Sequence, residues 1–294
     1  MQAWNSITRQ VNDCLLYLLV PGLSVLLPSA WSRSLLARLS RWGWFLEKNA
    51  DVAWIMARQF VDPGDERMWK SRWKQVELLE PRDLYMMLCG RSRAVLAEND
   101  CNVPIEVVKD RVIIGMHWGP SISILKLLQA AGMNPALPYR PPQKKILRIR
   151  PFYYLFLTMA TRYILKTLNE RAVPVGGASK GLRAMIDQPG SVIVVMDAPP
   201  MEGRPVIRSP VLGKNAAFNA GFPTILVDKR KEYMFYALSL HPDGSLRKKL
   251  ELQGPFRSDN AQAFLQDYAG FLDRHLSSDP AQWRIWHAAG QFWS

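Results

Sequence analysis

Hydrophobic and polar positions divide the chain into two unlike parts. The first 100 residues have apolar positions at helical spacing, and they predict helices at 50–60, 66–79 and 83–97. The breaks between these helices fall at Asp62–Pro63–Gly64 and at Glu80–Pro81. From about residue 104, short β-rich runs alternate with helical stretches. The organisation changes near residue 100, and no linker or internal repeat accompanies the change.

The second part predicts an α/β fold. Its clearest buried strands are 111–116 (RVIIGM) and 191–197 (SVIVVMD). Further strands are predicted at 134–139, 172–175, 224–227, 233–240 and 246–252, and helices at 119–131, 151–166, 179–188 and 259–275. Alternating strands and helices favour a mostly parallel central sheet flanked by helices. We therefore expect a helical region at 1–100 and an α/β domain at 101–294, packed as one compact unit.

An apolar run near the N-terminus could cross a membrane or lie on its surface. Residues 14–28 read CLLYLLVPGLSVLLP, which is shorter than the roughly 20 apolar residues of a spanning helix and contains Pro21–Gly22. Arginines and tryptophans follow this run at 31–44, a mixture typical of the lipid headgroup zone. Two short helices on the bilayer surface are expected. The alternative is a helical hairpin packed on the protein's own core.

Composition narrows the class of partner. The 294 residues include 38 Lys+Arg and 25 Asp+Glu, a net charge of +13, and 48% are hydrophobic, which excludes wholesale disorder. A basic, aromatic-rich chain suits an anionic membrane or a polyanion. Because only 21% of residues are charged, a protein that coats nucleic acid is disfavoured. Cys14, Cys89 and Cys101 have no disulfide or metal-ligand spacing, and we expect free thiols.

Two residues at predicted strand ends are candidates for catalysis. His117 follows the strand at 111–116 and precedes a helix that opens at Gly119–Pro120, where ligands bind in open α/β sheets. This is the position of a general base. Asp197 ends the strand at 191–197 and could orient the ring of His117. A structural histidine and a turn-forming aspartate are the alternatives.

Basic side chains gather in one segment. Arg140, Lys144, Lys145, Arg148 and Arg150 have no acid between them, and apolar residues interleave. Such a segment could bind phosphates, an acidic carrier protein or anionic headgroups, or it could be a solvated face. A second basic cluster lies at 229–231. The chain lacks a phosphate loop, a GxGxxG strand turn, a GxSxG elbow and zinc-ligand spacing, so no metal or cofactor is expected.

Five segments, in order, resemble the bacterial lipid A late acyltransferases of the lysophospholipid acyltransferase superfamily. They are VIIGMHWG around His117, YRP at 139–141, the stretch through Asp197 that ends VVMDAPP, SPVLGKNAAFNAG at 209–221, and the C-terminal SDPAQWRIWHAAGQFW. The resemblance covers roughly residues 15–293.

The resemblance implies a membrane-associated O-acyltransferase at the cytoplasmic face of the inner membrane. Such an enzyme moves a fatty acyl chain from acyl carrier protein or coenzyme A to a hydroxyl of a lipid or glycolipid, such as a lipid A precursor. It implies His117 as the base and no cofactor. Asp197 is a candidate orienter, and Lys214 a candidate at the mouth of the site. Arg140 would contact phosphate or thioester, and Lys144, Lys145, Arg148 and Arg150 would contact carrier or headgroup.

The chain departs from the family at one position. In the family, four residues separate the histidine from an Asp or Glu. The corresponding position in this chain is Ile122. An acid from elsewhere, a degenerate homologue that binds lipid or forms complexes, and diverged acyl chemistry are three explanations. An acyl-enzyme on Ser121 is a remote fourth. A carboxylate near His117 would favour an enzyme, and an apolar cage around it would favour binding. Nucleic-acid binding rests on net charge alone, and no nucleic-acid partner is expected.

Overall fold

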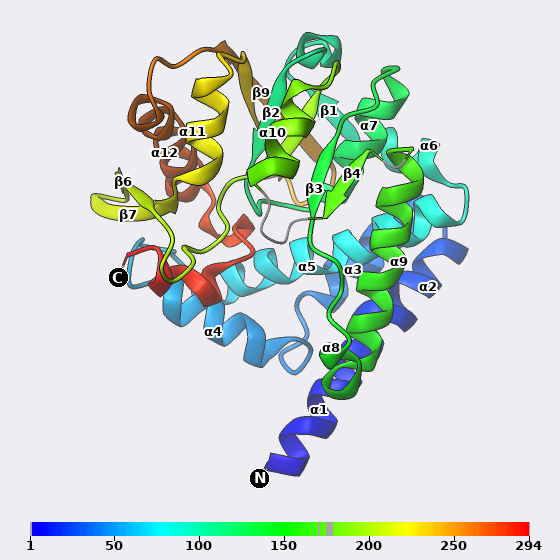
Figure 1. The fold of residues 1–294 in the computed structure, drawn as a ribbon. Helices are drawn as coiled ribbons and strands as arrows, with labels where there is room; N and C mark the ends of the chain where they lie inside the picture. The colour runs from blue at the N-terminus through cyan, green and yellow to red at the C-terminus, as the bar shows by residue number, and fades with distance from the viewer. Residues whose placement is uncertain (1, 170, 175–178, 294) are drawn as a thin grey trace.

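The computed structural model describes residues 2–169, 171–174 and 179–293, and its centre is a mixed five-stranded sheet (Figure 1). The strand order is β1-β9-β8-β2-β5. Strands β2, β5 and β8 run parallel, β9 is antiparallel to β8, and β1 is parallel to β9. The strands are β1 (Asn99–Cys101), β2 (Val112–Gly115), β5 (Val192–Val195), β8 (Tyr233–Leu240) and β9 (Lys248–Phe256). The carboxyl ends of β2, β5 and β8 therefore meet at one edge.

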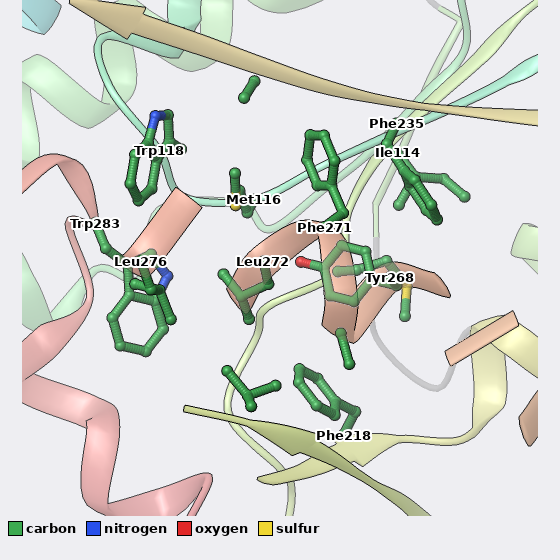
Figure 2. Close-up of a cluster of buried hydrophobic side chains, with 14 of the residues drawn as sticks. Ile114, Met116, Trp118, Phe218, Phe235, Tyr268, Phe271, Leu272, Leu276 and Trp283 are labelled. Carbon is green, nitrogen blue, oxygen red and sulfur yellow. The ribbon is translucent and has the colours of Figure 1, made fainter. Parts of the chain in front are cut away.

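Alternate residues of the central strands face two different layers of helices. On β2, Ile114 packs in a cluster with α10, α11 and α12, whereas Ile113 packs with α7 and α9. Figure 2 shows the first layer, in which the rings of Phe271 and Tyr268 of α12 pack against Phe235 of β8, with centroids 5.2 and 5.8 Å apart. The helices are α7 (Ile124–Ala130), α9 (Pro151–Thr167), α10 (Ser179–Asp187), α11 (Gly221–Asp228) and α12 (Ala261–Ser278). The result is an α/β fold with a mixed sheet between helices.

Two smaller β pairs lie outside the central sheet. Strand β3 (Leu137–Tyr139) pairs in parallel with β4 (Ala172–Pro174). Strands β6 (Val206–Val211) and β7 (Lys214–Asn219) form an antiparallel hairpin, which the sequence analysis did not predict. Its two-residue turn, Leu212–Gly213, has φ of 54° and 70°, the backbone that tight hairpins require.

The N-terminal helices cover the carboxyl edge of the parallel strands. The Arg72 guanidinium of α5 donates to the carbonyls of Leu240 and His241 at 2.7 and 2.9 Å, at the end of β8. Trp54 and Trp69 belong to the same hydrophobic cluster as the sheet. The helices are α1 (Gln2–Cys14), the π-helical turn η1 (Leu15–Leu19), α2 (Val20–Leu26), α3 (Ser29–Leu39), α4 (Glu47–Ala57), α5 (Glu66–Leu88) and α6 (Ser92–Leu96). Residues of α4 and the first part of α5 thus belong to a core of the sheet, whereas the other N-terminal helices pack in a separate cluster.

Predictions of secondary structure from the local sequence were wrong at three places. Residues 224–227 are helical, within α11, because Phe222, Ile225 and Leu226 bury one face at helical spacing. Pro81 lies inside α5 and does not break it, because residues on both sides are buried. Pro21 is likewise accommodated by the π-helical turn, and the Tyr17 carbonyl that Pro21 cannot bond accepts a hydrogen bond from the Tyr85 hydroxyl at 2.8 Å.

No helix among residues 2–169, 171–174 and 179–293 is long and apolar enough to cross a membrane. Large apolar side chains are nevertheless exposed along the N-terminal helices and α8 (Lys145–Ile149). These side chains are Ile7, Val11, Leu19, Leu23, Leu26, Trp31, Leu147 and Ile149.

Candidate active site

The register of two parallel strands brings His117 and Asp197 together. Gly115 of β2 pairs with Val195 of β5, and each candidate residue follows two positions later. Continued alignment beyond the strand ends therefore places the two side by side. The His117 Nδ1 lies 2.8 Å from the Asp197 Oδ1.

Asp197 is a fully buried carboxylate, and its hydrogen-bond partners among the described residues are nitrogen atoms. The backbone N–H of His117 donates to both of its oxygens, at 2.9 and 2.8 Å, and the Trp283 indole N–H donates to Oδ2 at 2.7 Å. Because the carboxylate accepts, Nδ1 of a neutral His117 carries the proton and Nε2 has a free lone pair. The His117 side chain is 43% exposed, whereas that of Asp197 is 0% exposed.

The environment raises the pKa of His117 above its ordinary value. Desolvation lowers this pKa, but the charge of Asp197 and the hydrogen bond to it outweigh that effect. Arg284 lowers the pKa of His117 and Glu80 raises it. The ring thus binds a proton more tightly than a free imidazole, a property that suits a general base.

Two glycines permit the close packing around His117. A Cβ on Gly115 would lie 2.3 Å from the ring of Tyr236. A Cβ on Gly119 would lie 1.9 Å from the Leu238 carbonyl oxygen, and Gly119 also has a φ of +55°. The loop after β2 therefore needs glycine on both sides of the histidine.

A C-terminal segment braces this loop. Gln282 accepts the Gly119 N–H at 2.9 Å through its carbonyl, Trp283 holds Asp197, and the Arg284 N–H donates to the His117 carbonyl at 2.9 Å. Three consecutive residues thus hold three parts of the site. None of the three was predicted as a site residue, although they lie in the C-terminal stretch that carries part of the family resemblance.

Acidic residues of α5 reach the same loop. The Arg284 side chain pairs with Glu77 at 2.9 Å and with Glu80 at 3.2 Å. Glu80 also accepts the backbone N–H of Ile122 at 3.2 Å. Burial raises the pKa of Glu80, although Arg284 and the Ile122 N–H oppose the rise. Ile122 itself is 7% exposed and packs in the N-terminal hydrophobic cluster.

The predicted basic residues do not gather around His117. Arg140, Lys144, Lys145 and Arg148 are exposed, and α8 lies beside α1 away from the central sheet (Figure 1). Arg150 pairs with Asp13 at 2.7 and 2.8 Å and lies over the Tyr153 ring. Lys214, on the β6–β7 hairpin, donates to the Gln59 carbonyl at 3.1 Å and lies over the Phe60 ring. The structure thus joins His117 with Asp197 and leaves the basic segment as a separate surface.

The described part of the chain contains no group of three or more His, Cys, Asp or Glu side chains arranged to hold a metal ion. In comparisons with known proteins, no family model and no curated protein matches the chain.

Proposed function

We propose that the protein is a membrane-associated O-acyltransferase that transfers a fatty acyl chain from a thioester donor to a hydroxyl of a lipid or glycolipid. The observation that carries this proposal is the His117–Asp197 pair. A half-exposed imidazole with a buried carboxylate on Nδ1 is the arrangement of a base that acts through Nε2.

The reaction follows from that geometry. His117 Nε2 takes the proton of the acceptor hydroxyl as its oxygen attacks the thioester carbonyl. The C–S bond then breaks, and the imidazolium returns the proton to the leaving thiolate. Asp197 holds the ring and stabilises the imidazolium through Nδ1–H, while Trp283 and the His117 amide fix the carboxylate. A base of this kind contributes about 10²–10⁴-fold to the rate.

The surface supports association with an anionic membrane. Exposed Leu147 and Ile149 share the α8 segment with Lys144, Lys145 and Arg148, and Gln10 of α1 donates to the Ile149 carbonyl at 2.7 Å. Exposed apolar residues of α1, Ile7 and Val11, therefore belong to a helix that contacts the basic segment, a combination that suits the cytoplasmic face of an inner membrane. Acyl carrier protein, which is acidic, and coenzyme A, which carries phosphates, would both suit the basic segment as donors.

A second candidate function is lipid binding or complex formation without catalysis. It is favoured by Ile122, which has an apolar side chain where the resembling family has an acid. The carboxylate of Asp197 on the ring of His117 favours the enzyme instead, because a binding protein has no need to fix one tautomer.

The experiment that tests the proposed activity is label transfer. Purified protein in detergent would be incubated with labelled acyl carrier protein or labelled acyl-coenzyme A and a membrane-lipid extract. We expect labelled lipid with the wild type and with His287→Ala, an exposed histidine used as the control. We expect none with His117→Ala. Full transfer by His117→Ala would exclude the mechanism, and no transfer by the wild type from either donor would favour the binding function.

A further inference from the structure

Apart from Asp197, the loop that carries His117 is held by groups that the proposed mechanism does not use. The loop leaves β2 at Gly115 and enters the short helical segment Ser121–Ser123. At one end, the His117 carbonyl accepts the backbone N–H of Arg284 at 2.9 Å. At the other end, the Ile122 N–H donates to the Glu80 carboxylate at 3.2 Å.

The two outside residues are also bonded to each other. Arg284 Nη1 lies 3.2 Å from Glu80 Oε1, so a closed ring of contacts runs from His117 through Arg284 and Glu80 to Ile122. Both side chains are largely buried, with exposed fractions of 24% for Arg284 and 13% for Glu80. A charged pair in such surroundings holds its geometry more firmly than a surface pair.

We propose that Glu80 and Arg284 are positioning residues that act as a clasp, fixing the backbone on both sides of His117 and setting the electrostatic surroundings of its ring. The clasp deepens the proposed function, on which its kinetic consequences rest. Its residues come from α5 and from the C-terminal segment, so it also ties the N-terminal helices to the catalytic loop.

The charged groups that face His117 predict changes in its pKa that loss of packing alone would not produce. Asp197 and Glu80 raise the pKa of the ring, and Arg284 lowers it. Removing the charge of Glu80 should therefore lower the pKa of His117, whereas removing the charge of Arg284 should raise it. General loosening of the loop would not give opposite signs.

The test is an NMR titration of the His117 imidazole in Glu80→Gln, Arg284→Gln and Glu77→Gln. The spectrum holds four histidines and can be assigned with His→Ala variants. Glu77→Gln is the matched control, since Glu77 pairs with the same arginine, whereas the Ile122 N–H donates to Glu80. We expect the His117 pKa to fall in Glu80→Gln, to rise in Arg284→Gln and to stay near the wild-type value in Glu77→Gln.

The same variants carry a kinetic prediction. In Glu80→Gln, kcat should fall about 10–100-fold with little change in KM, and the acidic limb of the pH profile should move to lower pH. An unchanged His117 pKa in Glu80→Gln, or equal shifts in Glu80→Gln and Glu77→Gln, would overturn the clasp. If Glu80→Gln does not fold, Arg284→Gln alone decides: a raised pKa supports the clasp, and an unchanged or lowered one overturns it. The expected NMR shifts without any acyl transfer by the wild type would uphold the clasp and refute the proposed activity.

Discussion

The indole N–H of Trp283 donates to the Asp197 carboxylate at 2.7 Å, across 86 residues of sequence. Trp283 is fully buried, and its ring packs edge-on against Trp286 at a centroid separation of 4.7 Å. The tryptophan therefore holds Oδ2 of Asp197, while the ring of His117 lies against Oδ1. The orientation of the candidate base depends on a residue near the C-terminus.

Trp283→Phe should weaken both the site and the fold. The substitution keeps a buried aromatic ring but leaves one hydrogen bond of a buried carboxylate unmade, which costs about 1–3 kcal/mol. We expect the free energy of unfolding in urea to fall by that amount and acyl transfer to fall with it. Wild-type stability and wild-type activity in this variant would contradict the role assigned to Trp283.

Asp197→Asn removes the negative charge of Asp197 and keeps nearly the same side-chain shape. Asp197 raises the pKa of His117 above the ordinary value of about 6.5, and the base acts in its neutral form. In the wild type, kcat/KM should therefore decline as the pH falls through a value above about 6.5. In Asp197→Asn this limb should move to lower pH, and kcat should drop about 10²–10⁴-fold because the tautomer is no longer fixed.

The pH dependence of acyl transfer measures both effects of Asp197→Asn. A profile that keeps its acidic limb at the wild-type pH would show that Asp197 does not set the pKa of His117. Asp187→Asn is a suitable control, since Asp187 is exposed and pairs with Lys229.

Gly119→Ala should be far more damaging than Gly132→Ala. Both glycines have positive φ, at +55° and +74°, but only Gly119 has a carbonyl oxygen where the Cβ would lie. Gly132→Ala should therefore cost only the backbone strain, about 1 kcal/mol. Gly119→Ala should cost about 3 kcal/mol or more and should also abolish transfer, because the loop must move. Denaturant unfolding of the two variants compares them directly, and equal costs would contradict the close approach to Leu238.

A buried ion network should make Lys248 important for stability. Its ammonium lies 2.5 Å from Asp83, and Asp83 also pairs with Arg82, which in turn pairs with Glu98. All four side chains are almost completely buried. Lys248→Met would leave Asp83 with one cation fewer, so we expect a loss of about 3–5 kcal/mol in the free energy of unfolding. The neighbouring Lys249→Met, at an exposed position of the same strand, should change it by less than about 0.5 kcal/mol.

The basic segment should govern binding to anionic vesicles. Lys144, Lys145 and Arg148 are exposed, and each basic residue at a membrane surface contributes about 1 kcal/mol. The triple change to Gln should weaken binding to phosphatidylglycerol-containing vesicles about 100-fold, and should have little effect with phosphatidylcholine alone. Lys229→Gln with Lys231→Gln is the control. Vesicle flotation at low and high salt measures this, and equal effects of the two sets would contradict the assigned surface.

The pairing of His117 with Asp197 could be predicted because each follows a strand that the apolar pattern marks clearly. The contacts of Glu80 and Arg284 with the loop of His117 could not be predicted from the sequence pattern. Glu80 meets Ile122 because α5 continues through Pro81, whereas the local signal predicted a break there. Arg284 reaches His117 from 167 residues away, and no local periodicity specifies such a contact. The strand predicted at 224–227 was wrong for a related reason, since burial of one helical face outweighed the β propensity of its residues.

Because Gln282, Trp283 and Arg284 hold the loop of His117, the site can form only after these residues have been made. During synthesis the chain emerges from its N-terminus, so β2 and β5 can pair long before residues 282–284 are made. A ribosome that has reached the end of α12 would therefore carry a nascent chain with His117 and Asp197 already made but without Gln282, Trp283 or Arg284 to hold their loop. The candidate base is therefore held in place only after residues 282–284 have left the ribosome, by which time both strands that carry His117 and Asp197 are available.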